Sequence, residues 1–234
     1  MGKAPESWQS LEDVNASIIR CRACPRLVAY REEVARVKRK AFINQTYWGK
    51  PIPGWGDPNA RVWIIGLAPA AHGGNRTGRV FTGDRSGDFL YAALYRAGFA
   101  NQPTSVSIDD GLRLHDVYLS AAVRCAPPDN KPTPAEFTNC RPYLSADLNL
   151  LRNMRVILAL GKIAFDSVRK VLADAGHNVA GARPVFGHDV AYLVGNYHLV
   201  ASYHPSQRNT QTGLLTTAMM DRVLARVKDV VTQS

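Results

Sequence analysis

A long polar segment follows the first apolar strand-like run and carries many side chains that could do chemistry. Val62 to Ile65 has the length and composition of a buried strand, and Gly66 then opens a glycine-rich stretch that continues to Asp84. In open α/β sheets, ligands bind in the loops that leave the carboxyl ends of strands. A connection of this length is usually functional or disordered, and the apolar pair Val80 and Phe81 argues against disorder. The stretch therefore predicts a ligand-binding loop without regular structure.

The four cysteines form a second candidate site. Cys21 and Cys24 make a C-x2-C pair near the beginning of the chain, and Cys125 and Cys140 follow much later. In a reducing compartment, such a set more often binds metal or does redox chemistry than forms disulfides. Four thiolates suit an iron-sulfur cluster and tetrahedral zinc, so the spacing alone does not choose between them.

Apolar periodicity predicts the elements that must position these residues. Strands are expected at residues 62–65, 117–123, 155–160, 190–194 and 197–202, the last two as a hairpin. Helices are expected at residues 11–20, 25–38, 86–97 with Ser86 as N-cap, 133–153, 161–176 and 214–231, and the Pro- and Gly-rich residues 42–60 read as loop. This alternation predicts a single three-layer α/β/α domain over residues 1–234. Its central sheet is four-stranded and mainly parallel, and residues 1 to about 40 form an N-terminal helical appendage.

Three loops should open on one edge of this sheet, because they follow Gly66, Val123 and Ser202 at the carboxyl ends of parallel strands. That shared edge is the predicted site. The nearest nucleotide motif, Gly73 to Val80, differs from a phosphate-binding loop at the lysine and hydroxyl positions, and no G-x-G-x-x-G is present. A nucleotide-binding site is therefore not expected.

Taken together, three features resemble the uracil-DNA glycosylase superfamily, and within it the family 5 (type B) enzymes of bacteria and archaea. They are G-L-A-P-A-A-H-G-G-N-R-T-G-R-V-F-T-G-D at Gly66–Asp84, H-P-S-Q-R-N at His204–Asn209, and the four cysteines. The match extends from Cys21 to about Thr216. It implies a uracil-DNA glycosylase fold and a monofunctional glycosylase of base excision repair, which flips a deaminated base out of DNA and hydrolyses its N-glycosidic bond.

The resemblance also implies roles for four side chains. Departure of the base leaves positive charge on the sugar and negative charge on the base. Asp84 would stabilise the sugar cation and orient water, and His204 would donate a hydrogen bond toward the uracil O2. Asn130 would position the water or the base edge, and Phe81 would stack on the flipped ring.

Each of these residues has a structural alternative. Asp84 could simply cap a helix without taking part in catalysis, and His204 could be a structural histidine whose hydrogen bonds are satisfied within the fold. Asn130 could only form a turn in its Pro-rich loop, and Phe81 could anchor the loop in the core.

Further residues complete the expected site. Gly66, Ala68, Ala70 and Asn209 are the additional substrate-binding candidates. Ala68 and Ala70 stand where family 1 enzymes have an aspartate and a tyrosine, so the pocket should also admit hypoxanthine or 5-substituted uracils. The DNA-binding candidates are Arg76, Arg79, Ser206 and Arg208; Arg208 and the preceding glutamine are polar where relatives carry an apolar wedge.

By the same resemblance, Cys21, Cys24, Cys125 and Cys140 are the ligands of a [4Fe-4S] cluster, with zinc as the alternative. The cluster would have a structural role, tying the N-terminal helices to the loop after Val123.

Composition agrees with a nucleic-acid partner. Lysine and arginine number 29 against 19 acidic residues, a formal charge of +10, and no apolar run reaches the length of a membrane span. We expect a monomeric cytoplasmic protein of a bacterium or archaeon, associated with the nucleoid, that acts on DNA containing uracil or other deaminated bases. A non-catalytic basic DNA-binding module and an iron-sulfur redox protein are the rival interpretations.

Overall fold

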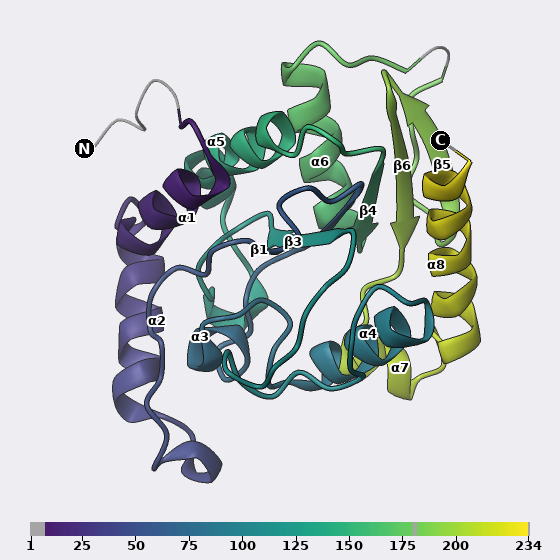
Figure 1. Cartoon of the computed structure of the whole chain (residues 1–234). Coiled ribbons are helices and arrows are strands. Elements are labelled where there is room, and N and C mark those ends of the chain that lie inside the picture. The colour runs from purple at the N-terminus through teal and green to yellow at the C-terminus, as the bar shows by residue number, and fades with distance from the viewer. Residues whose placement is uncertain (1–7, 180–181, 234) are drawn as a thin grey trace.

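A six-stranded sheet lies at the centre of the computed structural model, which describes residues 8–179 and 182–233 (Figure 1). The strand order is β1-β3-β2-β4-β6-β5. The pairs β3-β2, β2-β4 and β4-β6 are parallel, and the edge strands β1 and β5 are antiparallel to their neighbours. The predicted four-stranded parallel sheet is therefore confirmed as the centre of a wider sheet. The strands are β1 Trp55–Gly56, β2 Val62–Gly66, β3 Val117–Ala121, β4 Val156–Leu160, β5 Val190–Val194 and β6 Tyr197–Ser202.

The central strands are apolar because both faces of the sheet are covered. Every residue of β2, β3 and β4 is buried. Side chains alternate between the two faces: Val62 and Ile64 join one core, and Trp63 and Ile65 join the other.

Helices cover both faces of the sheet. α4 (Arg85–Arg96) and α8 (Thr217–Thr232) contact each other over one core, and α5 (Pro134–Leu150) and α6 (Lys162–Asp174) contact each other over the second. The predicted capping box at Thr133 and Glu136 opens α5. The three-layer α/β/α class is confirmed.

The N-terminal helices α1 (Leu11–Arg20) and α2 (Pro25–Val37) lie along one side of the domain (Figure 1). Val14 and Ile18 of α1 pack against Tyr143 and Ala146 of α5. α2 contacts α3 (Gly74–Thr77), a single helical turn inside the polar segment after β2. Residues 1–7 of the predicted appendage lie outside the described residues.

Three local expectations are wrong. Asp84, not Ser86, is the N-cap of α4, because its extended backbone lets its carboxylate accept from the Gly87 N–H at 3.0 Å. The segment from Gly66 to Asp84 contains the helical turn α3. The predicted loop 42–60 contains β1, which pairs with β3. Two 3₁₀ turns and a short helix complete the elements: η1 Lys40–Phe42, η2 Pro128–Asn130 and α7 Gln207–Gln211.

Within the described ranges, the helices are all too short or too polar to cross a lipid bilayer.

Candidate active site and cysteine pocket

The carboxyl ends of β2, β3 and β6 bring the three predicted loops to one edge of the sheet. Beyond the strand ends, the Ala122 N–H donates to the Gly66 carbonyl at 3.0 Å, and the Val123 N–H donates to the Leu67 carbonyl at 2.9 Å. The loop after β6 then carries Tyr203 to Asn209 away from the same edge, where α3, the start of α4 and α7 also lie (Figure 1). The common edge expected from the sequence is therefore formed.

Phe81 and His204 are neighbours at this edge. Their ring centroids are 5.9 Å apart, with an angle of 33° between the planes. Phe81 also covers the end of β2, where a Cβ on Gly66 would lie 2.6 Å from its Cζ. Its backbone adopts φ 51°, a left-handed conformation that is unusual for an aromatic residue. Phe81 is only 8% exposed, so it does anchor the loop in the core, and stacking on a base stays a prediction.

Asp84 combines a capping role with a second, differently placed oxygen. Its Oδ1 accepts from Gly87 at the start of α4. Its Oδ2 lies over Gly73, where an added Cβ would be 2.0 Å away, so only glycine fits there. Burial raises the pKa of Asp84, while backbone N–H groups and Arg76 oppose that shift. Asp84 therefore does cap α4, through Oδ1. Its Oδ2 is not used by the cap, and its role in stabilising the sugar cation stays a prediction.

His204 is held in a neutral state. Burial lowers the pKa of its imidazole to about 4, so at neutral pH one ring nitrogen donates and the other accepts. Close behind it, a Cβ on Gly161 would lie 3.2 Å from the His204 Cβ. Asn209 Nδ2 donates to the His204 carbonyl at 2.8 Å, so this amide positions the histidine segment.

Asn130 belongs to a different loop, the one after β3. It is exposed and, like Asp129, has a positive φ, in the turn η2 after the cysteine-bearing part of the loop. No contact brings it to Asp84 or His204 among the described residues, and its role stays a prediction. Ala68 and Ala70 are half-buried in the loop after β2, and Ala68 packs beside the cysteines.

Arg76 and Arg79 are buried inside the loop they were expected to expose. Arg79 is 4% exposed and forms an ion pair with Asp110 at 2.7 Å. Arg76 is 9% exposed, and its Nη2 donates to the Gly83 carbonyl at 2.8 Å. Both guanidinium groups brace the segment that ends at Asp84.

The exposed cations at this edge are elsewhere. Arg208 is exposed on α7, which Ser206 caps by accepting from the Asn209 N–H at 3.3 Å. Arg85, which follows Asp84, has a side chain that is 77% exposed. Sequence reasoning missed Arg85, although its position next to the carboxylate was a usable signal.

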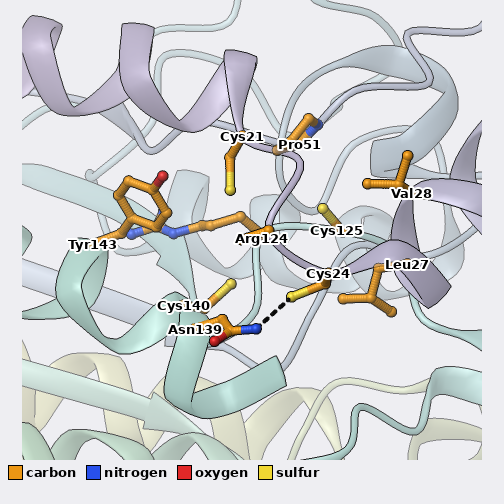
Figure 2. A pocket seen from close by; sticks show the side chains of 11 residues that line it. Cys21, Cys24, Leu27, Val28, Pro51, Arg124, Cys125, Asn139, Cys140 and Tyr143 are labelled. Atoms are coloured by element: carbon orange, nitrogen blue, oxygen red, sulfur yellow. Dashed lines mark hydrogen bonds between the residues drawn. The ribbon is translucent and has the colours of Figure 1, made fainter. Parts of the chain in front are cut away.

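The four cysteines line one pocket between the N-terminal helices and the loop after β3. Figure 2 shows the sulfurs of Cys21, Cys24, Cys125 and Cys140 around a shared space. All four thiols are free. Leu27, Val28, Pro51 and Tyr143 are among the other side chains that line the pocket.

Burial favours the protonated form of three of these thiols. It raises the pKa of Cys24, and it raises the pKa of Cys125 and Cys140 to about 12. Asn139 Nδ2 donates to the Cys24 sulfur at 3.4 Å. Among residues 8–179 and 182–233, the His, Cys, Asp and Glu side chains form no group of three close enough to hold a single ion.

Two arginines beside this pocket were missed from the sequence. Arg31 of α2 and Arg124, next to Cys125, are each only 2% exposed. Arg124 forms an ion pair with Asp147, which is fully buried on α5. The position of Arg124 beside a cysteine was a possible signal, whereas nothing in the helical pattern of α2 marks Arg31 as buried.

Comparison with known proteins finds relatives along most of the chain. The family model of the uracil DNA glycosylase superfamily matches residues 53–228. The type-5 uracil-DNA glycosylase of Mycobacterium bovis is 52% identical over 221 residues, which are 94% of this chain and 81% of the relative. That of Thermus thermophilus is 54% identical over 209 residues, 89% of this chain and 92% of the relative. That of Pyrobaculum aerophilum is 44% identical over 222 residues, which are 95% of this chain and 93% of the relative. The resemblance drawn from the three motifs is thereby confirmed.

Proposed function

The chain belongs to the uracil DNA glycosylase superfamily, and from this membership we propose that it removes uracil from DNA by hydrolysing the N-glycosidic bond. The single observation that supports catalysis most is the placement of Phe81, Asp84 and His204 on loops at one sheet edge. A non-catalytic DNA-binding module would not need a neutral histidine that contacts an aromatic ring on the same loop as a half-buried carboxylate.

Asp84 and His204 suit the two charges that develop as the bond breaks. The carboxylate of Asp84 stabilises positive charge on the deoxyribose and orients the attacking water. His204, neutral because burial lowers its pKa to about 4, donates to the uracil O2 as negative charge collects on the base. Asn209 holds the histidine segment by donating to the His204 carbonyl, and Asn130, in the exposed turn η2, positions the water or the base edge.

Phe81 gives the flipped base a flat surface, and the small side chains of Ala68 and Ala70 leave space around it. We extend the proposal to hypoxanthine and 5-substituted uracils on this ground. Excision confined to uracil, with no turnover of hypoxanthine or 5-hydroxymethyluracil in DNA, would contradict the roomy pocket.

Contacts with the DNA backbone come from the exposed part of the edge. Arg208, Ser206 and the newly identified Arg85 are placed to meet phosphates, which attract cations and hydrogen-bond donors. Arg76 and Arg79, which the sequence suggested as DNA-binding residues, are not part of this contact, because their guanidinium groups bind partners inside the protein.

The cysteine pocket fits a [4Fe-4S] cluster held by Cys21, Cys24, Cys125 and Cys140. Support comes from the four thiols that line one pocket, a ligand set that suits a [4Fe-4S] cluster or tetrahedral zinc, and from the family resemblance, which favours the cluster. When bound, the cluster supplies thiolate–iron bonds that join the helix α2 start, the loop after β3 and α5. Brown protein with absorbance near 400 nm after anaerobic preparation would support this assignment; colourless protein carrying zinc would contradict it.

We further propose that the protein is a monomer. We also propose that it acts in the cytoplasm at the nucleoid, because its substrate is DNA. A redox function is the second candidate. It has weaker support, since three of the four cysteines are buried, which keeps a cluster away from a soluble redox partner.

The test is excision from a labelled duplex containing one uracil, followed by alkaline cleavage at abasic sites. The wild type should give alkali-dependent scission, with scission from the equivalent thymine duplex as the background. Absence of scission at any enzyme concentration would refute the glycosylase proposal and favour a binding module.

A further inference from the structure

Two buried arginines next to the cysteine pocket have more hydrogen-bond donors than their visible partners accept from. Arg31 and Arg124 are each 2% exposed and rank among the largest fully buried side chains of the described residues. The Nε and Nη1 atoms of both side chains are buried and have no hydrogen-bond partner among those residues.

The remaining contacts of Arg31 are weak. Its Nη2 donates to the Cys21 carbonyl at a long 3.4 Å and lies 3.8 Å from a carboxylate oxygen of Glu32, whose side chain is 45% exposed. Glu32 is also bound to Arg22 through a shorter contact. Arg124 forms its ion pair with Asp147 through Nη2 alone, and Asp147 Oδ1 is itself unpartnered in the described part of the chain.

Burying unpaired guanidinium donors is expensive. An unsatisfied buried donor costs roughly 1–3 kcal/mol, and more when the group is charged. Four such nitrogen atoms in one region of a folded protein call for an anionic group that accepts from them. Among the described residues, none of the four nitrogen atoms has an acceptor.

The position of these donors identifies the acceptor. Arg124 lines the pocket together with all four cysteines, and Figure 2 shows its side chain extending between Cys21 and Cys140. Arg31 is close enough to act electrostatically on Cys125, and Arg124 acts in the same way on Cys140. Four thiolates around a [4Fe-4S]²⁺ core carry a net negative charge, so a loaded pocket provides the missing anion.

We propose that Arg31 and Arg124 are the internal counter-charges of the cluster, donating from their free N–H groups to its sulfur atoms. This inference rests on the proposed [4Fe-4S] assignment. Both residues are positioning residues for the cluster, and neither touches the DNA substrate. Hydrogen bonds to sulfur and nearby positive charge make a cluster easier to reduce and harder to lose.

Arg31 also links the pocket to the catalytic loop. Its backbone carbonyl accepts from Asn75 Nδ2 at 3.2 Å, and Asn75 is fully buried in α3. α3 begins next to Gly73, which contacts Asp84. Loss of the cluster should therefore loosen the loop that carries Asp84.

The experiment compares the anaerobically purified wild type with Arg31→Met, Arg31→Lys, Arg124→Met and Arg124→Lys. Arg36→Met is the matched control, because Arg36 lies on the same helix as Arg31 but its side chain is 73% exposed. Three quantities are measured: iron and sulfide per chain, the rate of iron loss to a chelator, and the midpoint potential of the cluster by redox titration.

Each Met variant should lose iron roughly tenfold faster than the wild type, as expected for a lost hydrogen bond between charged groups. Its midpoint potential should move to more negative values, because reduction adds negative charge that no cation offsets. The Lys variants should recover much of the potential, and Arg36→Met should match the wild type.

Two failures are distinguishable. A wild type that contains zinc, or no cluster, would overturn the proposed cofactor. A wild type with a full cluster whose potential and iron loss are the same in the Met variants would overturn the counter-charge inference alone. If a Met variant does not fold, Arg31→Gln and Arg124→Gln replace it as neutral polar comparators. A structure of the loaded protein in which the four nitrogen atoms bond elsewhere would also overturn the inference.

Discussion

Replacing Asp84 by asparagine separates its two roles, because asparagine keeps the helix cap and removes the charge. The Asp84 Oδ1 accepts from Gly87 at 3.0 Å, and the side-chain oxygen of asparagine can accept the same bond. Asp84→Asn should therefore preserve folding, whereas Asp84→Ala should lose about 1 kcal/mol of stability with the cap.

The rate effect follows from Coulomb's law. A carboxylate about 4 Å from a developing sugar cation contributes roughly 4 kcal/mol at an effective dielectric constant near 20. Its loss should slow the chemical step by about a thousandfold. Removing the charge should slow excision but should not destabilise the fold. Burial raises the pKa of Asp84, so above that pKa the ionised carboxylate lowers the stability of the wild type. Asp84→Asn should be at least as stable as the wild type at pH 7, with the difference vanishing in acid.

Single-turnover excision from a uracil duplex measures the rate, and urea unfolding measures the stability. Asp109→Asn, an exposed carboxylate replaced in the same way, is the control and should change neither. An Asp84→Asn variant with wild-type rate would refute the catalytic role and leave Asp84 as a helix cap. A variant that loses rate and stability together would show that the cap had been disturbed.

Three other side chains give independent tests. The free energy of unfolding should fall by at most about 3 kcal/mol as the pH falls from about 6.5 toward 4, because His204 takes up a proton in the unfolded state before it does so in the folded state. His204→Gln should remove this pH dependence from a series of urea-unfolding measurements. Arg79→Met should cost about 3–5 kcal/mol by leaving Asp110 without its buried partner, whereas the exposed Arg85→Met should change unfolding by less than about 0.5 kcal/mol; equal losses would contradict the bracing role. Asn209→Ala should slow excision about tenfold without changing the preference among bases, because Asn209 holds the His204 carbonyl; a changed preference would place its amide on the base instead.

The sheet and its loops could be predicted because their signals are local. The apolar runs around Ile64, Leu119 and Leu158 predict buried parallel strands, and Thr133 with Glu136 predicts the start of α5. Once the parallel order is known, the three loops must share an edge. The sequence alone therefore predicts that Asp84 and His204 lie in one region.

The remaining features depend on contacts distant in sequence. Arginines in a polar loop look exposed, but Arg79 is buried because Asp110, far along the chain, folds over it. Strand β1 has two residues and exists only through its pairing with β3. Asp84 and Ser86 are both suitable N-caps, and only the backbone conformation selects the aspartate.

The most direct test of the central claim is to quantify free uracil and abasic sites from one uracil-containing duplex. We expect uracil and alkali-labile sites in equal amounts, no strand scission before alkali, and an abasic C1′ that takes up labelled oxygen from water. Binding of the duplex without release of uracil would contradict the account, as would strand cleavage that precedes alkali treatment.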